Sequence, residues 1–116
     1  MRFNSDDGNN YHWIIHRNYM IGGNTYHESS KQVASAAINL YANARYEFLI
    51  EMTIRAKSGG SRLFMIDIEE LTDANNYGWI QFTGRWTNTA DEITTINLIT
   101  GAITEGEYFL FRQKPA

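Results

Sequence analysis

Three histidines in the first quarter of the chain are the first candidates for metal chemistry. His12 and His16 are four residues apart, and His27 follows them. On a helix this spacing would place His12 and His16 on one face as two zinc ligands, but on a strand the two side chains lie about 13 Å apart. No Glu follows His12 and no acidic residue separates the two, so the helical zinc-protease motif is absent. We therefore expect surface or interface histidines and no metal ion.

The segment from Asn4 to Asn10 offers a second kind of metal chemistry. It reads Asn-Ser-Asp-Asp-Gly-Asn-Asn and supplies several of the hard oxygen ligands that calcium prefers. No Glu closes the segment at the distance that an EF-hand requires. The same residue types favour a tight turn, because Asp, Asn and Gly tolerate left-handed backbone and bond to their own main chain. We interpret the segment as a turn and keep calcium binding as the alternative.

Asp67, Glu69 and Glu70 are the candidate acid and base residues. On a strand, Asp67 and Glu69 would share a face about 7 Å apart, which is compatible with inverting glycoside hydrolysis. Any solvent-facing strand offers such pairs, and the chain has no Gly-x-Ser-x-Gly elbow, no phosphate loop and no Gly-x-Gly-x-x-Gly motif. We therefore predict that the protein is not an enzyme. A hydrolase would need Asp67 and either glutamate to converge in one pocket.

The aromatic residues are candidates for binding sugar rings. Trp13, Trp79 and Trp86 occur with seven tyrosines, and exposed aromatic faces stack on sugars. Buried aromatic side chains also dominate the cores of small β domains. We expect Trp79 in the core and keep Trp13 and Trp86 as candidate ligand or interface residues.

The composition restricts what kind of domain positions these side chains. The 116 residues are 43% hydrophobic, 14% aromatic and 20% charged, which predicts one folded domain spanning residues 1–116. Cysteine is absent, so disulfides and thiolate metal sites are excluded. The net charge of -3 and the lack of a basic run argue against nucleic acid as a partner. No apolar stretch approaches the roughly 20 residues of a membrane helix, so we expect neither a membrane partner nor a cofactor.

Short runs of alternating or β-branched residues, separated by Gly, Asn and Asp clusters, predict strands rather than helices. The predicted strands cover residues 11–21, 46–54, 62–71, 77–83, 93–99 and 108–113. The Gly-rich residues 57–61 predict a hairpin between the second and third of these. Residues 30–40 have helical spacing of apolar residues but equally fit a loop that enters a strand at residues 37–41. The pattern as a whole predicts an all-β, antiparallel β-sandwich, and we choose the jelly-roll type.

Three passages share a pattern with one known family. Residues 2–11 read Arg-Phe-Asn, a short acidic turn with Gly, and then Asn-Tyr. Residues 65–77 read as an Asp-containing strand, an Asn-bearing turn and Tyr, and residues 84–111 run from Gly-Arg-Trp through Ile-Thr-Thr-Ile to Tyr-Phe-Leu-Phe. These passages resemble the short jelly-roll domains in virion structural proteins of tailed bacteriophages, including many marine and cyanobacterial ones. The resemblance implies a place in the virion and no catalytic residues.

Two features depart from that family's pattern. The family carries a strand's worth of sequence before Arg-Phe-Asn, whereas Met1 stands directly before it here, and the usual closing Leu-Tyr-Gly-Ile-Lys appears as Leu-Phe-Arg-Gln-Lys at residues 110–114. A missing first strand would leave a sheet edge open near the N-terminus, and an open edge pairs with a neighbour's strand. We therefore expect self-association by strand addition, as a trimer or a larger ring because closed symmetric oligomers are the norm.

These observations lead to one expected function and two alternatives. We expect a non-enzymatic virion structural protein, foremost a capsid decoration or cement protein that contacts the major capsid protein. A tail or fibre component is the first alternative. The second is a carbohydrate-binding module that recognises a host glycan, since fold alone does not decide function. Exposure of Trp13 or Trp86 in a shallow groove would favour this second alternative.

Overall fold

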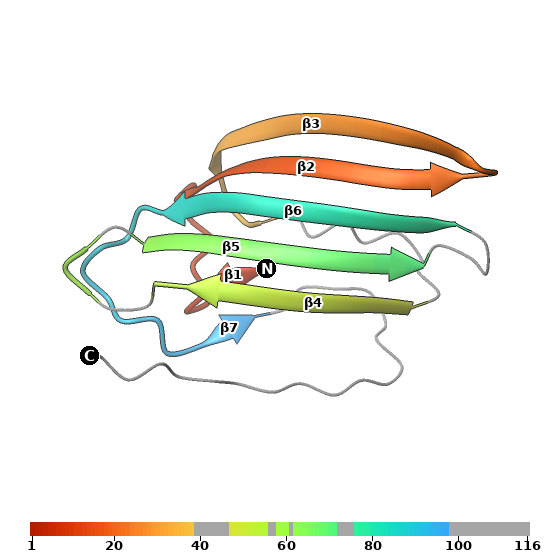
Figure 1. Ribbon diagram of the computed structural model, residues 1–116. Helices are drawn as coiled ribbons and strands as arrows, with labels where there is room; N and C mark the ends of the chain where they lie inside the picture. Colours follow the sequence, from red (N-terminus) through yellow and green to blue (C-terminus); the bar gives the residue numbers. More distant parts are fainter. Residues whose placement is uncertain (39–46, 56–57, 61, 72–75, 98–116) are drawn as a thin grey trace.

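In the computed structural model, the described residues are 1–38, 47–55, 58–60, 62–71 and 76–97, and they form only β-strands and their connections. The strands are β1 (Arg2–Phe3), β2 (Tyr11–Ile21), β3 (Asn24–Ser35), β4 (Glu47–Ile54), β5 (Arg62–Leu71), β6 (Tyr77–Trp86) and β7 (Ile96–Asn97). Figure 1 shows two sheets, one of five strands in the order β3-β2-β6-β5-β4 and one formed by β1 and β7. All pairings are antiparallel, so the all-β antiparallel prediction is confirmed. Within the described ranges there is no helix of the length and apolarity needed to cross a membrane.

The meander of β4, β5 and β6 follows from period-two alternation in the sequence. In β5, Phe64, Ile66 and Ile68 are buried on one side of the sheet while Leu63 and Met65 are exposed on the other. Partly buried Ile50, Met52 and Ile54 of β4 pack against this core from the neighbouring strand. Because one residue of slip would turn every apolar side chain to the wrong face, the alternation also fixes the register. The predicted hairpin of residues 46–54 and 62–71 is confirmed as β4 and β5, with residue 46 outside the described residues.

The hairpin of β2 and β3 turns on two glycines. Ile21 pairs with Asn24, and the two residues between them, Gly22 and Gly23, have φ angles of 58° and 82°. Positive φ at both central positions is the type I′ turn, which matches the twist of the flanking strands and is readily adopted by Gly-Gly. The predicted strand 11–21 is confirmed as β2, but β3 was not predicted. The helical alternative for residues 30–40 is wrong through Ser35, because these residues pair along β2.

The core lies between the five-stranded sheet and the short β1–β7 sheet, an arrangement consistent with a β-sandwich. Phe3 of β1 is fully buried and sets its ring 5.9 Å from Tyr11, 5.9 Å from Phe64 and 5.7 Å from Trp86. Tilted and edge-on aromatic contacts at these separations are favourable. The two-residue strand β1 therefore places one aromatic side chain at the centre of three others from the larger sheet.

The remaining strand predictions had mixed outcomes. Strand 77–83 continues to Trp86 as β6, and only Ile96–Asn97 of the predicted strand 93–99 is described as a strand. Strand 108–113 and most of the alternative strand 37–41 lie outside the described residues. Near the N-terminus, β1 pairs with β7 on one side, and Met1 exchanges backbone hydrogen bonds with Ile38 on the other. Within the described ranges, the outer strands of the large sheet are β3 and β4.

Candidate functional site

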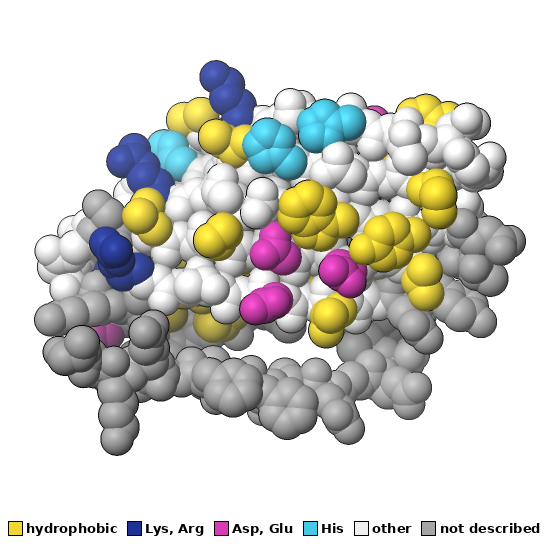
Figure 2. Space-filling view, viewed as in Figure 1, with side chains coloured by type: hydrophobic (Ala, Val, Ile, Leu, Met, Phe, Trp, Pro, Cys, Tyr) yellow, Lys and Arg dark blue, Asp and Glu magenta, His cyan; other side chains and the backbone are white. Residues whose placement is uncertain are grey.

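The candidate site lies on the face of the five-stranded sheet that points away from β1, which we call the outer face. Antiparallel pairing aligns its side chains in rows that cross the strands. One row consists of Ser29, His16, Gln81, Asp67 and Glu51, and the next consists of His27, Asn18, Trp79, Glu69 and Leu49. The outer face therefore presents imidazole, amide, aromatic and carboxylate groups side by side on a nearly continuous surface (Figure 2).

Two aromatic side chains of β6 form the apolar part of this face. Tyr77 and Trp79 are two residues apart, so both point outward, and they are 43% and 36% exposed. They line a shallow depression of about 600 Å³ together with residues from three other strands, among them Asn18, His27 and Glu69. The expectation that Trp79 belongs to the core is wrong. In β6 it alternates with buried Gly78 and Ile80, and this alternation was the signal that could have identified it as an outward side chain.

Trp13 and Trp86 lie in the core instead. Trp86 is 1% exposed and Trp13 is 7% exposed. The Trp13 indole Nε1 donates a hydrogen bond to the Ala37 carbonyl at 3.2 Å, and its ring meets Phe82 edge-on at 5.5 Å. Neither ring presents a face on which a sugar could stack. The tryptophan with an accessible ring is therefore Trp79, and the sequence reasoning had favoured the other two.

The histidines share a surface but do not converge on an ion. His16 and His27 lie on the outer face with their ring centroids 6.4 Å apart in a stacked arrangement. The ring Nδ1 of His27 is paired with the Asn18 side-chain oxygen. His12 lies on the same face of β2, four residues from His16. Among the described residues, no three His, Asp or Glu side chains are close enough together to hold a metal ion.

The three candidate carboxylates are divided between the two faces of the sheet. Asp67 and Glu69 share the outer face as predicted, with Glu51 directly across from Asp67 on β4. Glu70 points to the inner face, where it is 2% exposed and its Oε1 lies 3.6 Å from a guanidinium nitrogen of Arg17. Glu70 therefore does not meet the condition that a hydrolase would need, namely convergence with Asp67, because it points to the opposite face of β5.

The Asn4–Asn10 segment is a tight turn that is held together by hydrogen bonds to the carboxylate of Asp6. Asp6 accepts hydrogen bonds from the Gly8 backbone N–H at 2.9 Å, from the Asn10 amide at 3.0 Å and from the Trp86 indole at 2.6 Å. Burial raises the pKa of Asp6, but the hydrogen bonds from Asn10, Trp86 and Gly8 outweigh this effect and bring the pKa below its usual value. Both oxygens of the Asp6 carboxylate thus accept hydrogen bonds from groups of the chain itself, in agreement with the interpretation of this segment as a turn.

Asn4 ties the same turn to the residues before β7. Its side-chain oxygen accepts hydrogen bonds from the backbone N–H groups of Thr94 and Thr95 at 2.8 and 3.1 Å, and its amide donates to the Glu92 carbonyl at 2.6 Å. Asn4 has a φ of 50°, a left-handed conformation that Asn adopts more readily than most residues. We call the contacts of Phe3, Asn4 and Asp6 with Trp86 and residues 92–95 the latch.

The site as a whole combines apolar contact area with hydrogen-bonding groups. An exposed Trp–Tyr pair supplies apolar contact area, and the amide of Asn18 and the carboxylate of Glu69 flank it on the neighbouring strands. Flat aromatic surfaces with polar neighbours bind sugars or protein side chains by stacking and hydrogen bonding. Comparisons with known proteins found no matching family model, no similar curated protein and no similar solved structure.

Proposed function

We propose that the protein is a non-enzymatic structural component of a tailed-phage virion, with capsid decoration ahead of a tail or fibre location. The proposal rests on the resemblance of residues 2–11 and 84–111 to virion jelly-roll domains. It includes the jelly-roll topology, the major capsid protein as a partner and a virion location. One geometric relationship supports reading these passages as a structural signature.

That relationship is the latch, because the first and last of the three passages that carry the resemblance meet there. Phe3, Asn4 and Asp6 come from the first passage, and Trp86 and Thr94 come from the second. Residues about 90 positions apart are thus held together by aromatic packing and hydrogen bonds. Residues of these passages contact one another and so stabilise the fold. Structural proteins that share a fold but differ in their surfaces would share residues of this kind. Pairing of β1 with β7, the first and last described strands, also suits a jelly roll.

The test is rebinding of the purified chain to tailed-phage particles from which this component has been removed. Light scattering would give its mass alone, and co-sedimentation would report binding to the stripped particles. Saturable binding to stripped capsids, with no binding to particles that keep the component, would support capsid decoration. Binding to isolated tails would support the tail alternative. A chain that co-sediments with neither part would overturn the virion proposal. The same mass measurement tests the predicted trimer or larger ring.

A glycan-binding module is the second candidate, and the exposure of Trp79 and Tyr77 is the observation that favours it. The test is affinity electrophoresis through gels that contain neutral polysaccharides. Retardation that is lost in Trp79→Ala, but kept in Met65→Ala, would support glycan binding at the depression. Met65 is the matched control because it is an exposed apolar residue of the outer face that does not line the depression. Equal mobility in gels with and without polysaccharide would remove this candidate.

A further inference from the structure

The outer face carries more exposed apolar surface than one small ligand would use. Large apolar side chains are exposed over its whole length, including Ile14, Met20, Leu49, Leu63 and Met65 in addition to the aromatic pair of β6. Figure 2 shows them spread across the sheet among polar groups. A protein interface mixes apolar and aromatic side chains with polar ones over a broad area, whereas a small ligand contacts only a few side chains. The distribution therefore points to a protein partner that covers the full face.

The size and composition of the face fit such a partner. Five strands about 4.8 Å apart and ten residues at about 3.3 Å each give a face on the order of 700 Å². A standard protein interface covers about 800 Å² on each partner. Tyrosine, tryptophan, methionine and arginine are enriched at interfaces, and all four residue types occur here, as Tyr77, Trp79, Met65 and Arg85.

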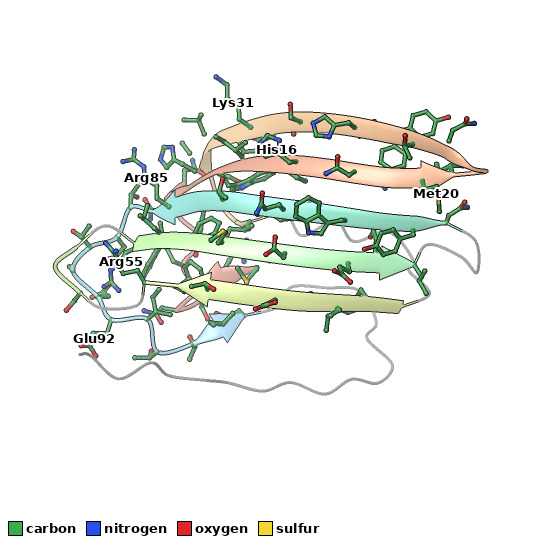
Figure 3. All side chains as sticks on the ribbon, in the orientation of Figure 1. His16, Met20, Lys31, Arg55, Arg85 and Glu92 are labelled. Carbon is green, nitrogen blue, oxygen red and sulfur yellow. The ribbon has the colours of Figure 1, made fainter. Side chains whose placement is uncertain are left out.

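Charge divides the outer face into two halves along β6. The β4–β5 half carries the carboxylates of Glu51, Asp67 and Glu69. On the β2–β3 half, the ionisable side chains of the outer face are Lys31 and the three histidines. Figures 2 and 3 show this separation, with the imidazoles and Lys31 above β6 and the carboxylates below it. Arg55 and Arg85 lie at one end of the face, with Arg55 directly after β4 on the carboxylate half and Arg85 on β6 (Figure 3).

These halves are complementary to each other. A two-fold axis that runs parallel to β6 and lies just above the sheet would turn a second copy over onto the first. The β5 carboxylates of one chain would then lie over the β2 imidazoles of the other, and Glu51 would lie near Lys31. A two-fold interface uses the same patch on both subunits, so it requires such self-complementarity. Tyr77, Trp79 and Arg85 lie on the dividing strand and would meet their own symmetry mates, so the charge complementarity lies on the two sides of β6 and not along it.

We propose that the outer face binds the outer face of a second copy of this chain, forming a two-fold, face-to-face dimer. The occupant is a second copy because the carboxylates of the face lie on one side of β6, whereas Lys31 and the imidazoles, which can bind carboxylates, lie on the other, and a copy rotated about that strand would bring the two sets together twice. This contact differs from strand addition at a sheet edge, since it uses side chains of the face and leaves β3 and β4 as outer strands. It goes beyond the virion proposal and stands or fails independently of it.

The test reverses the charge of each half separately. The acidic variant is Lys31→Glu with His16→Glu, and the basic variant is Glu51→Lys with Glu69→Lys. All four side chains are exposed, so the variants are expected to fold, and circular dichroism would check this. Asp7→Lys with Glu92→Lys is the matched control for the basic variant, because it makes the same change in net charge at exposed residues away from the outer face.

The expected masses distinguish the proposal from its rivals. Light scattering should give a dimer for the unaltered chain and for the control, in place of the trimer or larger ring that strand addition would give. Each reversed variant alone should self-associate at least about tenfold more weakly, because like charges then face each other. An equimolar mixture of the two variants should recover the dimer, since an acidic face would meet a basic one. A monomeric unaltered chain, unchanged association in either variant, or no recovery in the mixture would overturn the proposal, whether or not the chain binds virions.

Discussion

The indole Nε1 of Trp86 donates a 2.6 Å hydrogen bond to Oδ2 of Asp6, a residue 80 positions earlier in the chain. Trp86 ends β6 in the large sheet, and Asp6 lies in the turn between β1 and β2. The same carboxylate organises the turn through Gly8 and Asn10. One charged group thus links local turn geometry to long-range packing, and this gives the fold a specific sensitivity to acid.

We predict that Asp6 contributes stability that is present above about pH 4 and lost below it. The hydrogen bonds lower the pKa of Asp6 in the folded state relative to the unfolded chain. A carboxyl group with a lowered folded pKa favours folding while it is ionised, and this contribution disappears as the pH falls through the folded pKa. Urea unfolding at pH 7 and near pH 3 should therefore show a smaller loss of stability in Asp6→Asn than in the unaltered chain. Equal losses in both would contradict the prediction.

Gly84 should tolerate no side chain, because the sheet backbone and an aromatic ring occupy the space. A Cβ on Gly84 would lie 2.2 Å from the carbonyl oxygen of His12 and 2.6 Å from the Phe64 ring. Gly84→Ala should therefore destabilise the fold by about 1–3 kcal/mol or more. Gly60→Ala is the control, since no atom lies within 4 Å of its added Cβ. If chemical denaturation gave the two variants the same midpoint, the space at Gly84 would not exclude a side chain, and the prediction would be wrong.

Arg17 and Glu70 should behave as one buried unit. Their charged groups lie 3.6 Å apart on the inner face, and the Arg17 guanidinium also lies 4.3 Å from the centre of the Tyr19 ring. Removing Arg17 takes this cation away from the buried Glu70 carboxylate, at a cost of about 3 kcal/mol, whereas removing Glu70 leaves Arg17 with Glu28, whose Oε2 lies 3.9 Å from the guanidinium. Arg17→Met and Glu70→Gln should each lower the free energy of unfolding. The double variant should lose less than the sum of the two single losses. A double-mutant cycle measured by urea unfolding should give a coupling of at least about 1 kcal/mol, and additive effects would refute the pairing.

The sequence was most informative where apolar and polar residues alternate. In β4, the alternation of Ile50, Met52 and Ile54 with polar residues predicted a half-buried strand, and these three side chains do pack against the core, because burial on one face is what stabilises such a strand. In β3, by contrast, residues from Asn24 to Ala34 are all exposed, so no burial pattern was available to identify a strand. Pairing with β2 and the turn at Gly22 and Gly23 hold this strand in place.

The candidate site was harder to predict for a related reason. Trp79 and Trp86 are both in β6, yet they point to opposite faces because they are seven positions apart, and side chains at an odd offset on a strand lie on opposite faces. Assigning the faces requires knowing that β6 lies between β2 and β5, which local spacing does not reveal. The latch between Asp6 and Trp86 is a contact of the same long-range kind. Its members appeared in the sequence only as parts of separate motifs.

The opposite placement of the two β6 tryptophans leads to a last prediction. Trp86 is buried against Phe3 and lies 5.8 Å from the Arg62 guanidinium, whereas Trp79 is exposed on the outer face. Trp86→Ala should cost about 3–5 kcal/mol through the cavity that it leaves and should also release Asp6. Trp79→Ala should change the free energy of unfolding by no more than about 0.5 kcal/mol, as is usual for surface substitutions.

Urea unfolding of both variants, measured at a concentration where the chain is monomeric, would check the difference. At higher concentration, a loss of self-association in Trp79→Ala could then be attributed to the outer face, because the fold itself is intact. A large loss of monomer stability in Trp79→Ala would mean instead that this ring supports the fold. In that case the depression that it lines would no longer be a separable binding surface.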